Sequence, residues 1–399
     1  MINYQNPFGK YNGTEAEYAL RVLDSENDEN GGFPWVTKFE EQFCKLSGAK
    51  YAIAVNSATS GLHAALIAVG VTNGDEVIQP ALTVVMNSFV ILQSGAVPIY
   101  ADVDPNTWNI TAETIEKKIT KKTKAIMAVS LFGLPLDMEP ILKLAAKYKL
   151  RVIDDSAETL CGEYNGSFAG VHADMAIYSF ENKKHMSSGS EGGMIITNNE
   201  QFAINARKFS GIGYKNLTAS AGRTSLASSV FQSPNYERHD VIGLNYRMNA
   251  ITAAVGLAQL ERARHLVERR ICIGEMFNKV VGGCAWIKPQ GTIKNANHTY
   301  YTYGFIYQGK EKKGIEWHEF YKKYKAMGGD GFYAAWKNPY LEPALKGKIY
   351  GGVKLEPGLC EVAEDYQTKI MLFKTNYRNL GDARRNCEIL KKLIHEIGC

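Results

Sequence analysis

The sequence lacks several patterns that would place the protein in other classes. Its seven cysteines are scattered, and none has the close Cys or His spacing that a zinc site or a disulfide framework needs. We therefore expect no metal site and a reducing compartment. No apolar run approaches the ~20 residues that span a bilayer, and residues 1–10 lack the basic and then apolar pattern of a secretion signal. These absences predict a cytoplasmic protein with no membrane partner.

Positive charge is not gathered in one block either. The 399-residue chain has a formal net charge of +5, but its lysines and arginines are interleaved with acids, as in residues 261–264 and 268–270. This pattern is typical of solvated helix faces, so we expect no nucleic-acid partner. Hydrophobic residues make up 45% and charged residues 22% of the chain, as in an ordinary globular protein. At this length, a large domain and a smaller one are expected.

Short apolar strands alternate with amphipathic helical stretches from about residue 50 onward. This alternation predicts an α/β domain with a mostly parallel sheet. Strands are expected at residues 51–55, 76–78, 97–100, 125–129, 151–153, 175–180 and 193–197, and helices at residues 62–69, 84–92, 112–119, 138–148 and 201–209.

The second half of the chain has a different pattern. Residues 210–240 are rich in small and polar residues with little periodicity, which predicts a long, partly ordered loop. Residues 250–280 predict one or two long helices that bridge two domains, because apolar residues recur there at helical spacing. A strand at 299–307 and helices at 314–327 and 382–397 then predict a small α+β domain. We expect a large domain with an N-terminal arm over residues 1–265 and a small C-terminal domain over residues 266–399.

Three polar segments follow predicted strands, and ligands bind outside the carboxyl ends of strands in open α/β sheets. Residues 56–61 lie between a strand and a helix, where small residues and a helix N-terminus can bind a phosphate. Ser and Thr at such a place are also ordinary N-caps. Asp154 and Asp155 end a strand, where an acid can pair with a cationic ring nitrogen or simply form a turn or a cap.

The third segment, residues 178–186, contains Lys183 and Lys184 and is followed by serine and glycine. A lysine that leaves a strand end in flexible surroundings can reach the aldehyde of a cofactor. Paired lysines are more often solvated, so this segment alone would say little. The occurrence of all three segments together favours a cofactor site.

The run from Tyr178 to Thr197 resembles the Schiff-base segment of the DegT/StrS-type sugar aminotransferases, which are fold-type I enzymes dependent on pyridoxal 5'-phosphate (PLP). The shared pattern is Ser-Phe, three residues, Lys, and then Glu-Gly-Gly before a hydrophobic strand. Further segments resemble the same family, namely Ser57-Ala58-Thr59, Val152–Ala157, Gly243–Met248 and Ala253–Leu260. The resemblance implies an α/β fold with a mostly parallel, seven-stranded sheet between helices, a smaller α+β C-terminal domain and a PLP cofactor.

The resemblance also implies a role for individual residues. Lys184 would form the Schiff base and Asp155 would pair with the pyridine nitrogen, and these two are the expected catalytic residues. The remaining cofactor contacts would come from Ser57, Ala58, Thr59 and Ser179 at the phosphate, from Glu158 where the family often has a Gln at the phenolic oxygen, and from Val84 where the family usually has an aromatic stacked on the ring. Asn245 would reach the phosphate of the neighbouring subunit, so a homodimer with a shared active site is the expected minimum assembly.

The implied activity is the transfer of an amino group to the carbonyl of a carbohydrate. The donor would be an amino acid, by analogy glutamate, and the acceptor a keto or aldehyde sugar linked to a nucleotide, in polysaccharide or amino-sugar biosynthesis. The aromatic residues of segment 328–336 could line the acceptor pocket or simply pack.

Three alternatives stay open. One residue more than the family pattern separates Lys184 from Glu191, and counting back from Glu191 puts His185 in the lysine's place. Dehydratases of this family have a histidine there, so a sugar dehydratase using PLP or its amine form is one alternative. A non-catalytic PLP-binding regulatory protein is the second, and a carbohydrate-binding module without a cofactor is the third.

Overall fold

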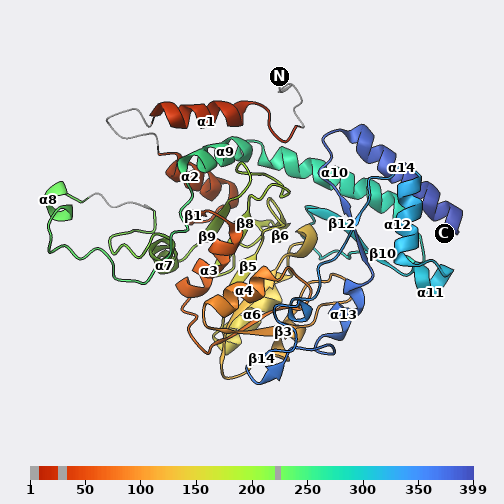
Figure 1. The fold of residues 1–399 in the computed structure, drawn as a ribbon, viewed down its shortest axis with the longest axis horizontal. Helices are drawn as coiled ribbons and strands as arrows, with labels where there is room; N and C mark the ends of the chain where they lie inside the picture. The colour runs from red at the N-terminus through yellow and green to blue at the C-terminus, as the bar shows by residue number, and fades with distance from the viewer. Residues whose placement is uncertain (1–8, 26–33, 221–225) are drawn as a thin grey trace.

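The centre of the molecule is a seven-stranded sheet with the strand order β1-β9-β8-β5-β4-β2-β3 (Figure 1). The computed structural model describes residues 9–25, 34–220 and 226–399. Strand β9 pairs antiparallel with both neighbours, whereas the pairs from β8 across to β3 are parallel. The predicted mostly parallel α/β fold is therefore confirmed. The strands are β1 (Tyr51–Val55), β2 (Glu76–Pro80), β3 (Val97–Ala101), β4 (Thr123–Val129), β5 (Arg151–Asp155), β8 (Met175–Ser179) and β9 (Gly193–Thr197).

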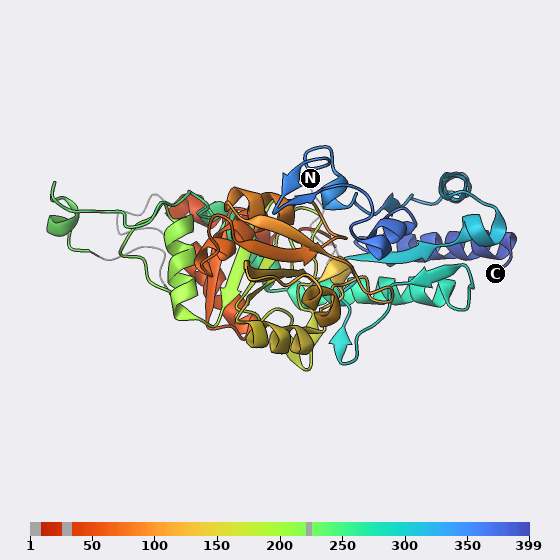
Figure 2. The same cartoon turned by 90° about the horizontal axis from the view of Figure 1, so that it is seen from below.

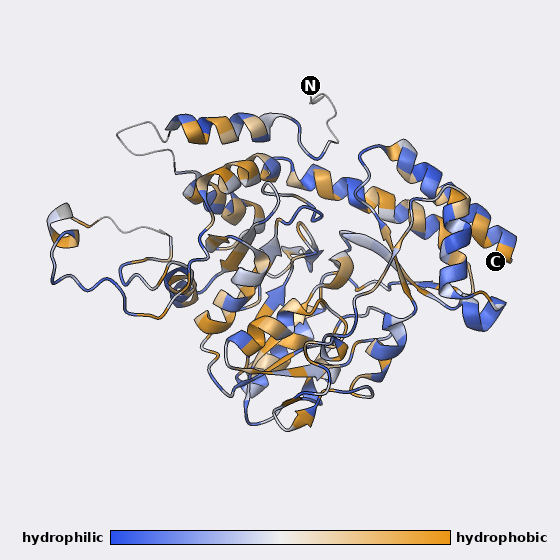
Figure 3. Ribbon diagram, in the orientation of Figure 1, coloured by the Kyte–Doolittle hydropathy of each residue, from blue (hydrophilic) through white to orange (hydrophobic). Residues whose placement is uncertain are grey.

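Helices cover both faces of this sheet because the strands carry apolar side chains on both sides. One face packs against α3 (Ala58–Ala68), α4 (Met86–Gln93) and α7 (Glu200–Ser210) through a cluster of buried, mostly aliphatic residues. The other face is covered by α2 (Trp35–Ser47), α5 (Ala112–Glu116), α6 (Met138–Tyr148) and α9 (Ala250–Leu260). In Figure 3 the hydrophobic colour is concentrated in the strands and in the helices beside them.

Two N-terminal helices were not predicted from the sequence. They are α1 (Thr14–Ser25), which lies along α9 in Figure 1, and α2. The signal for α2 was present, because Trp35, Phe39 and Phe43 are spaced four residues apart and all three are buried.

The chain beyond α9 forms a second, smaller sheet with the order β10-β12-β16-β13. Helices α10 (Ala263–Val281), α12 (Trp317–Ala326) and α14 (Leu380–Ile397) pack on it around a separate aromatic cluster. This part extends away from the seven-stranded sheet in Figure 2, where it is cyan and blue. The predicted boundary at residue 265 stays a prediction, since α10 runs through it. The strands here are β10 (Ile287–Pro289), β12 (Thr302–Tyr307), β13 (Tyr333–Ala334) and β16 (Ile370–Lys374).

The remaining elements are short. Residues 210–240 carry one turn of helix, α8 (Ser228–Phe231), as expected of a long loop, although residues 221–225 lie outside the described part. The residues 1–8 of the predicted N-terminal arm also lie outside it. The other short elements are η1 (Leu131–Gly133), β6 (Glu163–Tyr164), β7 (Ser167–Phe168), β11 (Ala296–Asn297), α11 (Gly309–Lys313), η2 (Pro339–Leu341), β14 (Ile349–Tyr350), β15 (Val353–Lys354) and α13 (Glu361–Gln367).

One disulfide corrects the expectation that the cysteines stay reduced. Cys284 and Cys399 are joined, although 115 residues separate them in sequence. The bond links the chain just after α10 to the second residue after α14. Because these two helices pack side by side, their ends meet, and spacing along the sequence gave no sign of it.

Candidate active site

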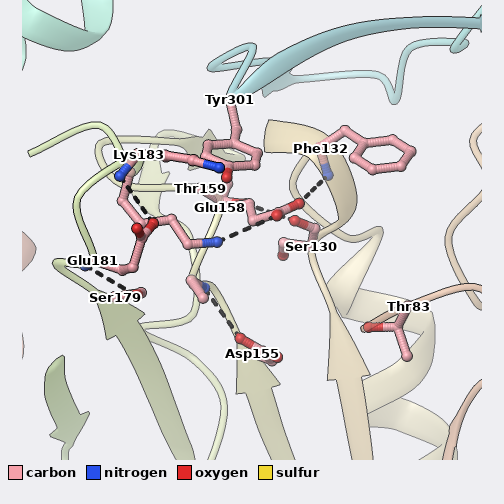
Figure 4. A network of polar contacts seen from close by, with 12 residues as sticks. Thr83, Ser130, Phe132, Asp155, Glu158, Thr159, Ser179, Glu181, Lys183 and Tyr301 are labelled. Carbon is pink, nitrogen blue, oxygen red and sulfur yellow. Dashed lines mark hydrogen bonds and ion pairs between the residues drawn. The ribbon is translucent and has the colours of Figure 1, made fainter. Parts of the chain in front are cut away.

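Three of the predicted site segments meet at one edge of the large sheet. Strands β5 and β8 are neighbours and run in the same direction, so Asp155 and the turn after Ser179 lie at the same edge. The start of α3 reaches this edge from β1, which lies on the far side of β9. Figure 4 shows the polar residues that gather there. The topology thus brings together residues that are more than a hundred positions apart.

Lys184 points into this group rather than into solvent. Its Nζ atom donates a hydrogen bond to Oε1 of Glu158 at 3.3 Å, and the side chains of the two residues are 15% and 8% exposed. The Tyr301 ring covers the ammonium at 4.4 Å. Burial alone would lower the pKa of Lys184, but the charges of Glu158, Tyr301 and Asp155 outweigh it, and the pKa is raised. The lysine therefore holds its proton firmly.

Glu158 is held by both of its carboxylate oxygens. Oε2 accepts a hydrogen bond from the backbone N–H of Phe132 at 2.9 Å, while Oε1 faces Lys184. Burial raises the pKa of Glu158, and the nearby lysine and the Phe132 N–H oppose the shift without reversing it. Phe132 presents this N–H from η1, where its backbone has a positive φ of 59°. A carboxyl in this position can accept or return a proton next to Lys184.

Asp155 ends β5 and is held by one residue that sequence reasoning missed. Asn87, near the start of α4, donates from Nδ2 to Oδ2 of Asp155 at 2.9 Å, and the N–H of Ala157 donates to Oδ1 at 3.2 Å. Burial raises the pKa of Asp155, while these bonds and Lys184 act against the rise. The carboxylate is thus fixed at the edge of the sheet. No local signal indicated this contact, because Asn87 and Ser88 are two ordinary polar residues near the start of a mostly apolar helix.

Asp154 lies on the opposite face of β5, because successive side chains alternate across a strand. It accepts a hydrogen bond from the Ser130 hydroxyl at 3.2 Å, and burial raises its pKa to about 7. The structure therefore separates two acids that are adjacent in the sequence, and only Asp155 faces Lys184.

His185 is turned away from this group. Its Nε2 atom is 3.1 Å from the carbonyl oxygen of Thr299, and the ring is buried. Since a carbonyl only accepts, Nε2 carries the proton, and burial holds the pKa of His185 well below its usual range. Of the two neighbours that the sequence left open, Lys184 is the one that points toward Glu158 and Asp155.

The turn carrying Lys184 is fixed from behind by a buried arginine on α10. The Arg270 guanidinium donates to the carbonyls of Lys183 and Lys184 at 2.8 and 2.7 Å, and to that of Tyr301 at 2.7 Å. It thereby links the lysine turn to the aromatic residue that covers it. The expectation that residues 268–270 form a solvated helix face is wrong for Arg270, which is buried. Tyr301 was not predicted as a site residue, because it lies outside the family motifs.

The start of α3 has the form expected of a phosphate-binding turn. Ser57 is the N-cap, and its side chain accepts from the N–H of Ser60 at 3.1 Å. Ala58 and Thr59 follow in the first turn, where backbone N–H groups have no acceptor within the helix. Gly193 of β9 packs so closely here that an added Cβ would lie 2.7 Å from the Ala58 nitrogen. The residues and the helix dipole suit a phosphate.

The other predicted contacts are more dispersed. Ser179 is buried at the end of β8, and its Oγ accepts from the N–H of Glu181 at 3.3 Å. Val84 is half-buried in the loop between β2 and α4. Asn245 is exposed on a segment held against β1, because the N–H of Asn56 donates to the Tyr246 carbonyl at 2.8 Å. The side chain is therefore accessible, and its contact with a second subunit stays a prediction.

No cluster of His, Cys, Asp or Glu in residues 9–25, 34–220 and 226–399 could hold a metal ion. Within the same ranges, no helix has the length and apolar character needed to cross a membrane.

The chain is similar to proteins of a known family. Residues 10–374 match the model of the DegT/DnrJ/EryC1/StrS aminotransferase family. A GDP-perosamine synthase from Escherichia coli O157:H7 is 36% identical over 301 residues, which is 75% of this chain and 77% of the relative. An aminotransferase from Psychrobacter cryohalolentis superposes with a TM-score of 0.85 and 26% identity, over 96% of this chain and 97% of the other.

The fold is also shared with a dehydratase. An Escherichia coli GDP-4-keto-6-deoxy-D-mannose-3-dehydratase, solved with bound hydrated PLP, has a TM-score of 0.83 and 22% identity over 99% of this chain and 100% of the other. At this identity the likeness concerns the fold alone, so the residues at the site must separate the two activities.

Proposed function

Because the chain belongs to the DegT/DnrJ/EryC1/StrS aminotransferase family, we propose that Lys184 is the residue that binds its PLP cofactor covalently and moves the proton during amino transfer. The protein is a PLP-dependent aminotransferase, as the sequence predicted. The observation that carries the proposal for Lys184 is its buried contact with Glu158, beside Asp155 at the edge of the sheet.

The residues at this edge suit each part of the cofactor. Ser57, Ala58 and Thr59 at the start of α3, with Ser179, would hold the phosphate. Asp155 would pair with the ring nitrogen, Glu158 would face the phenolic oxygen, and Val84 would contact the ring. PLP supplies an electron sink for the carbanion that forms when the amino donor loses its Cα proton. Asp155 would contribute by stabilising a positive charge on the ring nitrogen.

Lys184 would act as the base once its amine is free. A lysine can remove a proton only when it is neutral, and its raised pKa works against this. Glu158 lies 3.3 Å away and has a raised pKa of its own, so it is the nearest group that can take up or return the lysine's proton. We propose that the two residues exchange a proton during each half of the reaction.

The orientation of His185 argues against the dehydratase alternative. That activity calls for a histidine in place of the lysine, whereas the buried ring of His185 contacts the Thr299 carbonyl on the other side of the turn. A non-catalytic PLP-binding protein would share this geometry, but membership of an aminotransferase family argues against that alternative.

The acceptor proposed here is a keto sugar linked to a nucleotide, by analogy with relatives that are GDP-perosamine synthases. The donor proposed is glutamate. The aromatic residues of segment 328–336 were expected either to pack or to line the acceptor pocket. Phe332 packs in the core, whereas Tyr333 is 69% exposed. Trp336 stacks on Phe132, with ring centroids 5.7 Å apart. Because the Phe132 N–H bonds Glu158, Trp336 is placed to contact an acceptor near Lys184.

A homodimer with a shared site is proposed from the surface beside Asn245. Ile242 is 95% exposed and Leu244 43% exposed on the same segment, and such apolar exposure is typical of a surface that a partner covers. The cytoplasmic location stays a prediction.

Two measurements test the function. The PLP-loaded protein is treated with borohydride, and the modified peptide is identified by mass spectrometry; we expect the adduct on Lys184. An adduct on Lys183 would contradict the assignment. Keto sugars linked to GDP, UDP and dTDP are then incubated with glutamate and the enzyme, and the products are separated. We expect an amino sugar and 2-oxoglutarate in equal amounts, whereas a deoxy sugar without the amine would favour the dehydratase.

A further inference from the structure

A polar cavity of about 200 Å³ lies beside the turn that carries Lys184. Its walls come from the N-terminal segment at Gly9 and Lys10, the turn itself, helix α10, and the loop of residues 375–378 between β16 and α14. Apart from Lys184, none of the residues proposed to bind the cofactor lines it. The cavity is therefore separate from the turn at the start of α3.

The cavity has a strong excess of positive charge. Five cationic residues besides Lys184 line it, and its lining within the described residues includes no carboxylate; the five are Lys10, Lys183, Arg269, Arg270 and Arg378. Burial lowers the pKa of Lys10, and repulsion from Arg378 lowers it further, while Glu181 nearby opposes the shift. Positive charges gathered around a cavity favour the binding of an anion, because the anion is attracted to every one of them and offsets their mutual repulsion.

Two buried polar atoms of lining residues also lack a hydrogen-bond partner in the described part of the chain. They are Nδ1 of His185 and Oγ of Ser187, whose side chains are 5% and 1% exposed. Buried polar groups are nearly always hydrogen-bonded in native proteins, and unpaired ones call for an explanation. A bound ligand or its water would supply the missing partners.

The wall that holds these residues is well ordered by hydrogen bonds. Gln259 of α9 accepts from the N–H of Ser187 at 3.3 Å and donates to the Lys10 carbonyl at 2.6 Å. On the opposite wall, Nε of Arg269 donates to the carbonyl of Tyr377 at 3.0 Å. The N-terminal segment, the lysine turn and the loop before α14 are thus held in place around the cavity before any ligand enters, and preorganisation of this kind favours binding.

We propose that this cavity is a binding site for a small anion with carboxylate or phosphate oxygens. Its volume equals several times the ~30 Å³ that one water occupies in the liquid, enough for a compact anion but not for a nucleotide sugar. The ligand lies against the turn that positions Lys184 and is separate from the phosphate of the cofactor. The inference does not rest on the amino-transfer activity, because it concerns binding alone.

Calorimetric titration of the full-length, PLP-loaded protein tests the site, since PLP fills the phosphate turn at α3. Inorganic phosphate and glutarate are the two probes, in separate titrations at constant ionic strength. We expect saturable 1:1 binding of at least one, and the stronger probe identifies the preferred oxygen chemistry. Failure of both probes to saturate would overturn the proposal.

Matched variants locate the bound anion. Arg378→Ala removes a lining charge, and Arg384→Ala removes an exposed charge on α14 that does not line the cavity. Arg378→Ala should weaken binding roughly tenfold, as expected for the loss of one charge-assisted hydrogen bond, and Arg384→Ala should leave it unchanged. Equal weakening by both would mean that only the general charge of the surface matters, and the proposal would fail.

Ser187→Ala provides a second readout that does not depend on a charge. The change removes a buried hydroxyl that has no partner, so the melting temperature without ligand should not fall. Binding of the preferred probe should nevertheless weaken severalfold. Unchanged affinity in this variant, together with unchanged affinity in Arg378→Ala, would show that the anion does not bind in this cavity.

Discussion

The ammonium of Lys184 lies 3.3 Å from a carboxylate oxygen of Glu158, and this ion pair is largely shielded from solvent. The negative charge of Glu158 stabilises the protonated form of Lys184, and the positive charge of Lys184 stabilises the carboxylate of Glu158. Replacing one partner would leave a buried charge uncompensated, whereas proton transfer between them removes both charges at once. The pair can therefore store a proton without exposing it to bulk water.

Replacing the lysine should abolish both covalent cofactor binding and turnover. We expect Lys184→Ala to lower the rate of amino transfer by about 10²–10⁴-fold or more, the range for loss of a positioned general base. Lys183→Ala is the control, since Lys183 is the exposed neighbour. The measurements are product formation and borohydride labelling, and a Lys184→Ala protein with normal turnover would refute the role.

Replacing the glutamate should change the pH at which the lysine reacts. The Glu158 charge raises the pKa of Lys184, so Glu158→Gln should lower that pKa. More of the lysine is then neutral at pH 7–8, and we expect PLP to enter the cofactor-free protein faster there, with the pH profile displaced downward. Stopped-flow absorbance follows the reaction. Glu181→Gln serves as the control, and identical profiles for the wild type and Glu158→Gln would contradict the expectation.

The two adjacent aspartates should have different effects on catalysis. Asp155→Asn removes the charge that faces Lys184, and we expect turnover to fall by about 10²-fold or more, comparable to the loss of one electrostatic contact to a reacting group. Asp154→Asn changes the opposite face of β5 and should leave turnover nearly unchanged. Steady-state kinetics compare the two, and an equal loss in both would mean that strand β5 had simply been disturbed.

Asp154 should also affect how the free energy of unfolding depends on pH. Its pKa is raised to about 7 in the folded protein, compared with 3.8 for an ordinary aspartate. Between these values the folded state binds the proton and the unfolded state does not, so stability falls as the pH rises from about 4 to about 7. Asp154→Asn should make this part of the curve flatter. Urea unfolding at a series of pH values measures the slope, and an unchanged slope would exclude Asp154 as its source.

The exposed apolar segment beside Asn245 should determine the assembly. Ile242 is 95% exposed, and we expect Ile242→Asp to shift the protein from dimer to monomer by placing a charge in the interface. Ile349→Asp is the matched control, since Ile349 is 66% exposed on the distant β14. Size-exclusion chromatography with light scattering measures the mass. If both variants stay dimeric, the interface lies elsewhere.

Much of this architecture could be predicted from local patterns. The strands of the large sheet stand out because each is a short apolar run ended by a polar residue, and β5 ends at Asp155 for this reason. The family motifs also predicted Lys184 as the lysine that binds the cofactor, because its spacing from Ser179 is short and the strand end is rigid. Strand patterns and family motifs both consist of residues close together in the sequence, so the sequence by itself was enough to predict them.

The surroundings of the lysine were decided only by the tertiary structure. Nothing local indicated that Asn87 would hold Asp155, that Arg270 would fix the lysine turn, or that Tyr301 would cover the ammonium. The sequence predicted Lys184 but kept His185 as an alternative, because one extra residue shifts the pattern by one position. The direction of each side chain depends on its contacts in the folded protein. Lys184 contacts the carboxylate of Glu158, whereas His185 contacts the carbonyl of Thr299. Contacts between distant segments depend on how the strands are ordered in space, and a one-dimensional pattern does not contain that information.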